Sequence, residues 1–182
     1  MTTSYLELIH NGAMLLAMSF LFDLGLERWQ ISHRRIWQAF IGVLLGGIGI
    51  ILMFTPWVLT PGIFFYTRSV LLGFAGMFFG TLPTLITIAI LTAVRVLLGG
   101  AGMPMGISVI LVTGTMSILW RRWRRKPAET LTWRELYLFG WAVHVAMLLC
   151  PFTLPPETGR PLFAAIALPV LLIYPVGTMA LG

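Results

Sequence analysis

The chain has 182 residues, of which 58% are hydrophobic and only 10% are charged, and its formal net charge is +6. A soluble domain of this length is closer to half apolar and a quarter charged. The mean hydropathy of +0.93 therefore excludes an ordinary soluble domain and predicts an integral membrane protein. The single cysteine, Cys150, excludes an intrachain disulfide and a thiolate metal cluster.

Apolar segments follow one another along the whole chain, at residues 5–25, 37–58, 62–80, 83–98, 104–120, 136–153 and 161–182. They are continuous and lack the alternation of barrel strands, so they predict transmembrane helices, of which six or seven span the bilayer. The first segment is not a cleavable signal, because "MTTSYLELIH" lacks a basic start. The predicted fold is an all-α membrane bundle that forms one domain over residues 1–182.

The third and fourth segments are separated only by "GTLP". Thr81 can cap a helix there and Pro83 can occupy its first turn, so we predict a tight central antiparallel hairpin. Small residues four apart predict close packing between helices. They occur as the pairs Gly42/Gly46, Gly76/Gly80 and Ala13/Ala17.

Basic residues are concentrated in two of the predicted loops. "LERWQISHRRIW" holds three arginines and "RRWRRKPAETLTWRE" holds six basic residues, so that together they carry nine of the twelve Lys and Arg side chains. Basic loops face the cytoplasm, which predicts an external N-terminus and a cytoplasmic C-terminus in a bacterial inner membrane. The run "RRWRRK" is expected to be a solvated loop facing anionic lipid, in preference to a nucleic-acid site. The Gly- and Pro-rich connections "TPWVLTPG", "LGGAGMPMG" and "PFTLPPETGRP" then lie outside.

Arg68 and Arg95 are the only charged residues in an apolar stretch of the third and fourth segments. Each lies 13 residues from the "TL" at the centre of the predicted hairpin, about 20 Å along a helix, so both guanidiniums are predicted at the same depth in the outer half of the membrane. Neither helix carries an acid, and only Glu7 or Glu157 could reach them. Snorkelling to headgroups and an ion pair with Glu7 or backbone carbonyls are the structural alternatives. Two like charges side by side favour a clamp for a small carboxylate or phosphate that is open to the outside.

Several neighbours complete the predicted anion site. "GGAG", beginning with Gly99 and Gly100, can supply backbone N–H donors. Ser108 and Asn11 lie near the same depth, although an asparagine in a membrane helix more often joins helices. The sequence contains no metal-spaced set of ligands, paired carboxylates or phosphate loop, so neither a cofactor nor enzyme activity is expected. His144, in the middle of a segment, is expected to pack or hydrogen-bond.

The block "TRSVLLGFAGMFFGTLPTLITIAILTAVRVLLGGAGMPMG" resembles the membrane sensor module of LytS–YhcK-type receptors. The matching positions are Arg68, Gly73, Ala75, Gly76, Gly80, Arg95, Gly99 and Gly100. Leu168, Pro169, Gly177 and Thr178 also resemble the last helix of that module, although an asparagine expected near Tyr174 or Pro175 is absent. The resemblance implies a module that senses external solutes, including small carboxylates, and precedes a cytoplasmic histidine kinase or diguanylate cyclase.

The interpretation is a membrane signal-input module that binds a small external anion and signals to a cytoplasmic output domain or partner, with a homodimer left open. The chain reaches Gly182 without a polar tail, which favours a sensor portion of a longer receptor over a free-standing protein. The main alternative is the substrate-binding membrane subunit of an energy-coupling-factor-like transporter, which would pack through Ala13 and Ala17. A scaffold subunit with lipid-facing arginines is a third.

Overall fold

The computed structural model describes residues 35–54, 57–60, 63–65, 68–125 and 130–181. The first predicted segment, 5–25, lies outside the described residues. The elements in chain order are α2 (Arg35–Phe54), β1 (Trp57–Thr60), β2 (Ile63–Phe65), α3 (Arg68–Phe74), the π-helix η1 (Ala75–Phe79), α4 (Thr81–Leu98), α5 (Met103–Arg124), α6 (Trp133–Met147), the 3-10 helix η3 (Cys150–Thr153) and α7 (Pro156–Leu181).

The helices agree with the apolar segments that the sequence predicts. Within the described part of the chain, four stretches are long and apolar enough to cross a membrane: α2, α4, α5 and the stretch from Trp133 to Thr153. The helix formed by α3 and η1 together is apolar but shorter. The chain is therefore a multi-pass helical membrane protein. A count of seven helices is not confirmed, because the described residues contain six α-helices.

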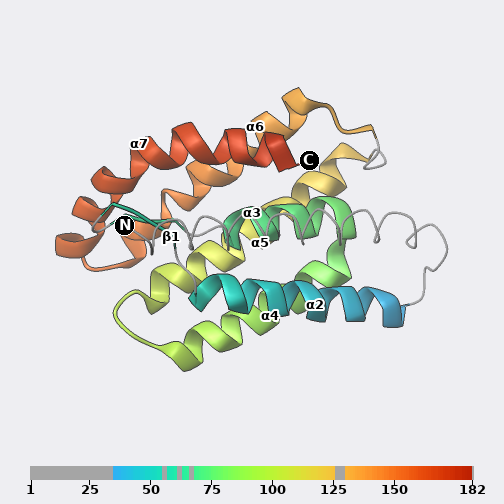
Figure 1. Ribbon diagram of the computed structural model, residues 1–182, viewed down its shortest axis with the longest axis horizontal. Helices are drawn as coiled ribbons and strands as arrows, with labels where there is room; N and C mark the ends of the chain where they lie inside the picture. The colour runs from blue at the N-terminus through green and yellow to red at the C-terminus, as the bar shows by residue number, and fades with distance from the viewer. Residues whose placement is uncertain (1–34, 55–56, 61–62, 66–67, 126–129, 182) are drawn as a thin grey trace, which may run out of the picture.

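The helices form layers around a central element (Figure 1). Helices α3 and α5 run through the middle, α2 and α4 cover one side, and α6 and α7 cover the other. Every residue from Arg68 to Gly80 is buried. A helix that is apolar all round is covered either by lipid or by neighbouring helices, and the burial of α3–η1 shows that its neighbours cover it. The segment α3–η1 is therefore the core of the bundle.

The two ends of the bundle differ in their connections (Figure 1). One end, called here the Gly100 end, holds the strands, the α4–α5 connection and η3, while the other, the Gly80 end, holds the η1–α4 turn and the α5–α6 connection. The connections predicted to be external thus gather at the Gly100 end. Arg121, Arg122, Arg124, Arg125 and Arg134 belong to the Gly80 end.

Strands β1 and β2 form a small antiparallel hairpin that the sequence analysis did not predict. Trp57 pairs with Phe65 and Val58 with Phe64, and the register shifts between Val58 and Thr60. The predicted helices 37–58 and 62–80 are thus too long on this side, because α2 ends at Phe54 and α3 begins at Arg68. β-branched and aromatic residues favour strands, and the local pairing wins over the continuous hydropathy of the run.

Gly80 is the single residue between η1 and α4, and its φ of 93° suits a residue without a β-carbon. The predicted cap at Thr81 is wrong: α4 begins at Thr81, with Gly80 as the N-cap and no side-chain cap bond. Pro83 does lie in the first turn. The tight hairpin is not confirmed, because α4 packs mainly on α2 and α5 rather than on α3.

Glycines mark where α2 and α4 approach closely. A β-carbon at Gly42 would lie 2.8 Å from the Pro83 carbonyl oxygen, and one at Gly46 would lie 3.1 Å from Cγ2 of Ile90. The hydroxyl of Thr87 donates to the Gly42 carbonyl at 3.1 Å, so the contact also carries a hydrogen bond between helices. This close approach of backbones is what small residues provide in membrane bundles.

Candidate anion-binding site

Arg68 is the first residue of α3, and it is buried with only 7% of its surface exposed. Its position at a helix N-terminus opposes the helix dipole, which favours anions there and disfavours cations. Arg68 is thus a buried guanidinium in an environment that favours a negative partner. Snorkelling, in which a guanidinium extends to solvent or headgroups, does not describe a side chain this deeply buried.

Arg95 lies in the last turn of α4, and its side chain crosses onto the beginning of α5. A β-carbon at Gly106 would lie 3.0 Å from Cδ of Arg95, and one at Gly102 would lie 3.3 Å from its Nη2. The two glycines are four residues apart, so they leave a groove along α5 that the arginine fills. The Nε of Arg95 is buried and has no hydrogen-bond partner among the described residues.

Helix α5 carries contacts from both arginine-bearing helices, and these contacts fix the register. The Leu72 carbonyl of α3 accepts from the Ser117 hydroxyl at 3.0 Å, and the Phe78 carbonyl of η1 accepts from Arg121 at 2.9 Å. Residue numbers rise in the same direction along both helices, so α3 and α5 run parallel. One turn before Leu72, Arg68 is then level with residues 110–113 of α5.

Helix α4 runs antiparallel to α5. Gly114 lies against Ile88, whereas Gly106 lies against Arg95, so residue numbers rise along α4 in the direction in which they fall along α5. The two arginines therefore meet α5 in its N-terminal half, roughly 6–10 Å apart along its axis. The sequence predicts equal depth for the two arginines, whereas the helix register separates them by about one to two turns along α5.

The auxiliary donors are arranged differently from the prediction. The Gly99 N–H donates to the carbonyls of Arg95 at 3.2 Å and Val96 at 3.1 Å, where it caps α4. Ser108 donates its hydroxyl to the Pro104 carbonyl at 2.8 Å. Gly100 is exposed with φ of 85° and open space around it. Asn11 lies outside the described residues.

The N-terminus of α5 is itself a source of positive potential. Gly102 is the N-cap and offers no side-chain cap, and Pro104 stands in the first turn. The Met103 N–H donates to the Gly100 carbonyl at 3.0 Å and Pro104 has no N–H, so the helix dipole is the main feature that favours an anion here. The guanidinium of Arg95 adds a full charge beside Gly102, which strengthens the same preference.

Thr92 is a neighbour of Arg95 that sequence reasoning missed. Its Oγ1 is buried and has no hydrogen-bond partner among the described residues, and it lies one turn before Arg95 on α4. Residues three apart share a helix face, so the hydroxyl and guanidinium face the same side. That i, i+3 spacing was visible in the sequence, although a threonine in an apolar helix gives little signal by itself.

The basic run at the Gly80 end differs most from the solvated loop that the sequence predicts. Residues 121–124 belong to α5 rather than to a solvated loop. Arg121 is partly buried and donates to the carbonyls of Met77 at 3.3 Å and Phe78 at 2.9 Å. Arg124 forms a salt bridge with Glu135 at the beginning of α6, with only 7% of its side chain exposed. Arg122 and Arg125 remain exposed, as a lipid-facing loop would require.

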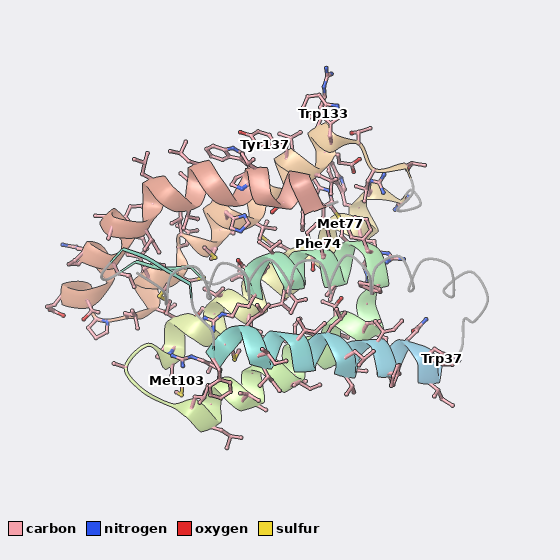
Figure 2. The ribbon with its side chains drawn as sticks, in the orientation of Figure 1. Trp37, Phe74, Met77, Met103, Trp133 and Tyr137 are labelled. Carbon is pink, nitrogen blue, oxygen red and sulfur yellow. The ribbon has the colours of Figure 1, made fainter. Side chains whose placement is uncertain are left out.

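Other chemistry is sparse in the described residues. His144 is buried, and its Nδ1 lies 2.6 Å from the Gly140 carbonyl, so it hydrogen-bonds within α6 as expected. No group of three or more His, Cys, Asp or Glu residues in the described ranges could hold a metal ion. A gap beside Phe74 and Met77, on the side of α3 that faces α6 and α7 (Figure 2), is too narrow to hold a water molecule.

Residues 22–182 match one protein-family model, 5TM-5TMR_LYT, described as the 5TMR of 5TMR-LYT. The chain belongs to this family. The match covers most of the chain and confirms the resemblance to the multi-transmembrane input domain of LytS-type receptors. A 5TMR-LYT domain is a sensor input domain and not a catalytic one. No curated protein and no solved structure matches the chain.

Proposed function

We propose that this 5TMR-LYT domain binds a small carboxylate from outside the cell and passes a conformational signal to a cytoplasmic output. The observation that carries the proposal is the convergence of two arginines on the N-terminal half of α5. Arg68 is buried at the beginning of α3, and Arg95 presses its guanidinium into the groove at Gly102 and Gly106. A guanidinium beside the beginning of α5, with a second buried arginine farther along the same helix, favours an anion at this end of the bundle.

The chemistry of the site favours a carboxylate. Guanidinium groups bind carboxylates with two parallel hydrogen bonds, and they remain charged at any physiological pH. The buried Nε of Arg95 has a donor to offer, and the hydroxyl of Thr92 lies on the same face. Ser108 can add a second hydroxyl by giving up its bond to Pro104, which is a local helix contact of low cost. The exposed "GGAG" backbone at Gly100 remains an auxiliary donor in this proposal.

The proposed orientation puts the Gly100 end outside. Six of the twelve basic residues lie in described elements next to the connections of the Gly80 end: Arg35, Arg121, Arg122, Arg124, Arg125 and Arg134. The positive-inside rule assigns such an end to the cytoplasm. The proposed anion site then opens to the outside of a bacterial inner membrane, and α7 leads toward a histidine kinase or diguanylate cyclase on the inside.

A ligand signals only if it binds two conformations unequally. The proposed site spans α3, α4 and α5, so an anion that draws the two guanidiniums together moves α3 relative to α5. Helix α3 is the buried core of the bundle, and its movement must be felt by α6 and α7. The transporter alternative has no support from the family match, which is to a sensor input domain.

The test is a thermal-shift screen of the purified domain with acetate, lactate, malonate, succinate and citrate. At least one of these anions should stabilise the wild type, and Arg68→Ala and Arg95→Ala should each lose that stabilisation. Arg160→Ala is the matched control, because Arg160 is an exposed arginine in the first turns of α7, at the same end of the bundle. If no anion stabilises the wild type, or if both site variants respond as fully as the control, the proposal fails.

A further inference from the structure

The buried core helix changes its hydrogen-bonding pattern at the Gly80 end. Residues Ala75–Phe79 form a π-helix, and the Gly80 N–H donates to the Ala75 carbonyl, five residues back, at 3.2 Å. π-helical turns are rare and are less stable than the α-helical alternative, so something must hold this one in place. Conversion of a π turn to an α turn shifts the bonded register by one residue. That shift corresponds to about 1.5 Å and 100° of rotation of the helix before it.

Arg121 is positioned to hold the π turn. Its Nη1 donates to the carbonyls of Met77 and Phe78, at 3.3 and 2.9 Å, both of which belong to η1. The last carbonyls of a helix lack partners within it and carry the negative end of the dipole, so a guanidinium is the best partner they can have. A β-carbon at Gly80 would lie 3.3 Å from the same nitrogen, so the absence of a side chain at Gly80 leaves room for the contact.

A second contact one turn away keeps α3 and α5 in the same register. Gly76 lies directly against Ser117, and its missing side chain lets the two backbones approach until a β-carbon would be 2.9 Å from the Ile118 nitrogen. Ser117 in turn donates to the Leu72 carbonyl. The carbonyls of α3 and η1 that face α5 are therefore held by two side chains of α5, Ser117 and Arg121. A shift of register would break both sets of bonds together.

We propose that Arg121 is a latch that holds the core helix in its π-helical form, and that its release carries the signal from the anion site to the Gly80 end. Arg68 and η1 lie at the two ends of one buried helix, so a displacement of Arg68 also displaces η1. Arg121 is a positioning residue in this scheme and does not contact the anion. Its neighbour Arg124 bonds Glu135, so movement of the end of α5 also reaches α6.

The latch rests on the proposed function only for the stimulus that releases it. Its first test therefore uses no anion: amide hydrogen exchange of the purified wild type, Arg121→Gln and Arg122→Gln. Arg122 is an exposed arginine on the same turn of α5 and is the matched control. Arg121→Gln should accelerate exchange roughly ten- to a hundredfold in residues 75–84, the scale of a lost charge-assisted bond, and should also accelerate it in residues 68–74. Arg122→Gln should leave both segments unchanged.

A third variant separates the latch from a general loss of folding. Arg121→Lys keeps the charge but cannot match the planar donor geometry of arginine, so its exchange in residues 75–84 should be intermediate. Equal acceleration across α6, α7 and η1 in Arg121→Gln and Arg121→Lys would overturn the latch, because it would mark a residue needed for the whole fold. Unchanged exchange in residues 75–84 of Arg121→Gln would also overturn it.

The second measurement repeats the exchange experiment with acetate, lactate and succinate added in turn. An anion that protects residues 68–74 of the wild type should also alter exchange in residues 75–84, and Arg121→Gln should lose this distant effect. Protection at residues 68–74 with no change at 75–84 would leave the anion site standing and overturn the transmission. If none of the three protects the wild type, the proposed function is contradicted for these anions, while the anion-free comparison still decides the latch.

Discussion

Gly106 and Arg95 lie so close that a β-carbon on the glycine would stand 3.0 Å from Cδ of the arginine and overlap its Nε. The guanidinium of Arg95 is thus aimed by the absence of a side chain on α5. We expect Gly106→Ala to push Arg95 out of its groove and to weaken anion binding by about ten- to a hundredfold, the scale of one lost charge-assisted contact. Dissociation constants from a thermal-shift titration measure this directly.

The control for Gly106→Ala is Gly47→Ala. Gly47 lies in the middle of α2, and a β-carbon there would meet no atom within 4 Å. Alanine in a helix interior is more stable than glycine by about 0.5–1 kcal/mol, so Gly47→Ala should raise the melting temperature and leave anion affinity unchanged. Equal affinities of the two variants would show that the position of Arg95 does not matter for binding.

Gly76→Leu tests the packing of the core helix on α5. The new side chain would be forced against Ser117 and the Ile118 nitrogen in a fully buried position, and overpacking of this kind costs about 1–3 kcal/mol or more. We expect a lower folded yield in detergent and a lower melting temperature than for Gly47→Leu. Wild-type yield and melting of Gly76→Leu would mean that α3 and α5 can separate without cost.

The sequence predicts most of the helices because apolar runs and their breaks are strong local signals. The run from Leu82 to Leu98 ends at two glycines, and α4 ends there too. The strands at Trp57 and Ile63 were missed because hydropathy alone cannot separate a short apolar strand from the end of a helix.

Other features depend on contacts between residues far apart in the chain. The π turn at Ala75–Phe79 is held by Arg121, more than forty residues later, and a run such as "RRWRRK" reads locally as a solvated loop. Charge spacing predicts Arg68 and Arg95 as candidate site residues, because two isolated arginines in apolar helices are conspicuous. It could not find Gly102 and Gly106 as the surface on which Arg95 lies, since that requires the register of α4 on α5.

The orientation of the bundle is tested by labelling single cysteines with an impermeant reagent in intact cells. Thr3→Cys and Thr158→Cys should react, because the positive-inside rule puts the N-terminus and the beginning of α7 outside. Ala128→Cys, in the basic connection between α5 and α6, should react only after the membrane is opened. The native Cys150 is buried and gives the background signal. Labelling of Ala128→Cys in intact cells without labelling of Thr3→Cys would show that the bundle has the opposite orientation in the membrane.

Arginine-to-lysine replacements separate charge from geometry at the proposed site. Lysine keeps the positive charge of Arg68 and Arg95 but cannot donate two parallel hydrogen bonds to a carboxylate. A site that works by charge alone would tolerate Arg68→Lys and Arg95→Lys, whereas a bidentate clamp would not. We therefore expect each replacement to weaken binding about ten- to a hundredfold while the melting temperature without anion stays close to that of the wild type, because the charge is retained.

Arg160→Lys is the matched control, since Arg160 is exposed at the same end of the bundle and should bind the anion as the wild type does. The measurement is a titration of each variant with the carboxylate that most stabilises the wild type. Wild-type affinity in both site variants would reduce the two arginines to a source of positive potential and remove the bidentate clamp. Loss of affinity in Arg95→Lys alone would assign the two parallel hydrogen bonds to Arg95. Arg68 would then contribute only its positive charge.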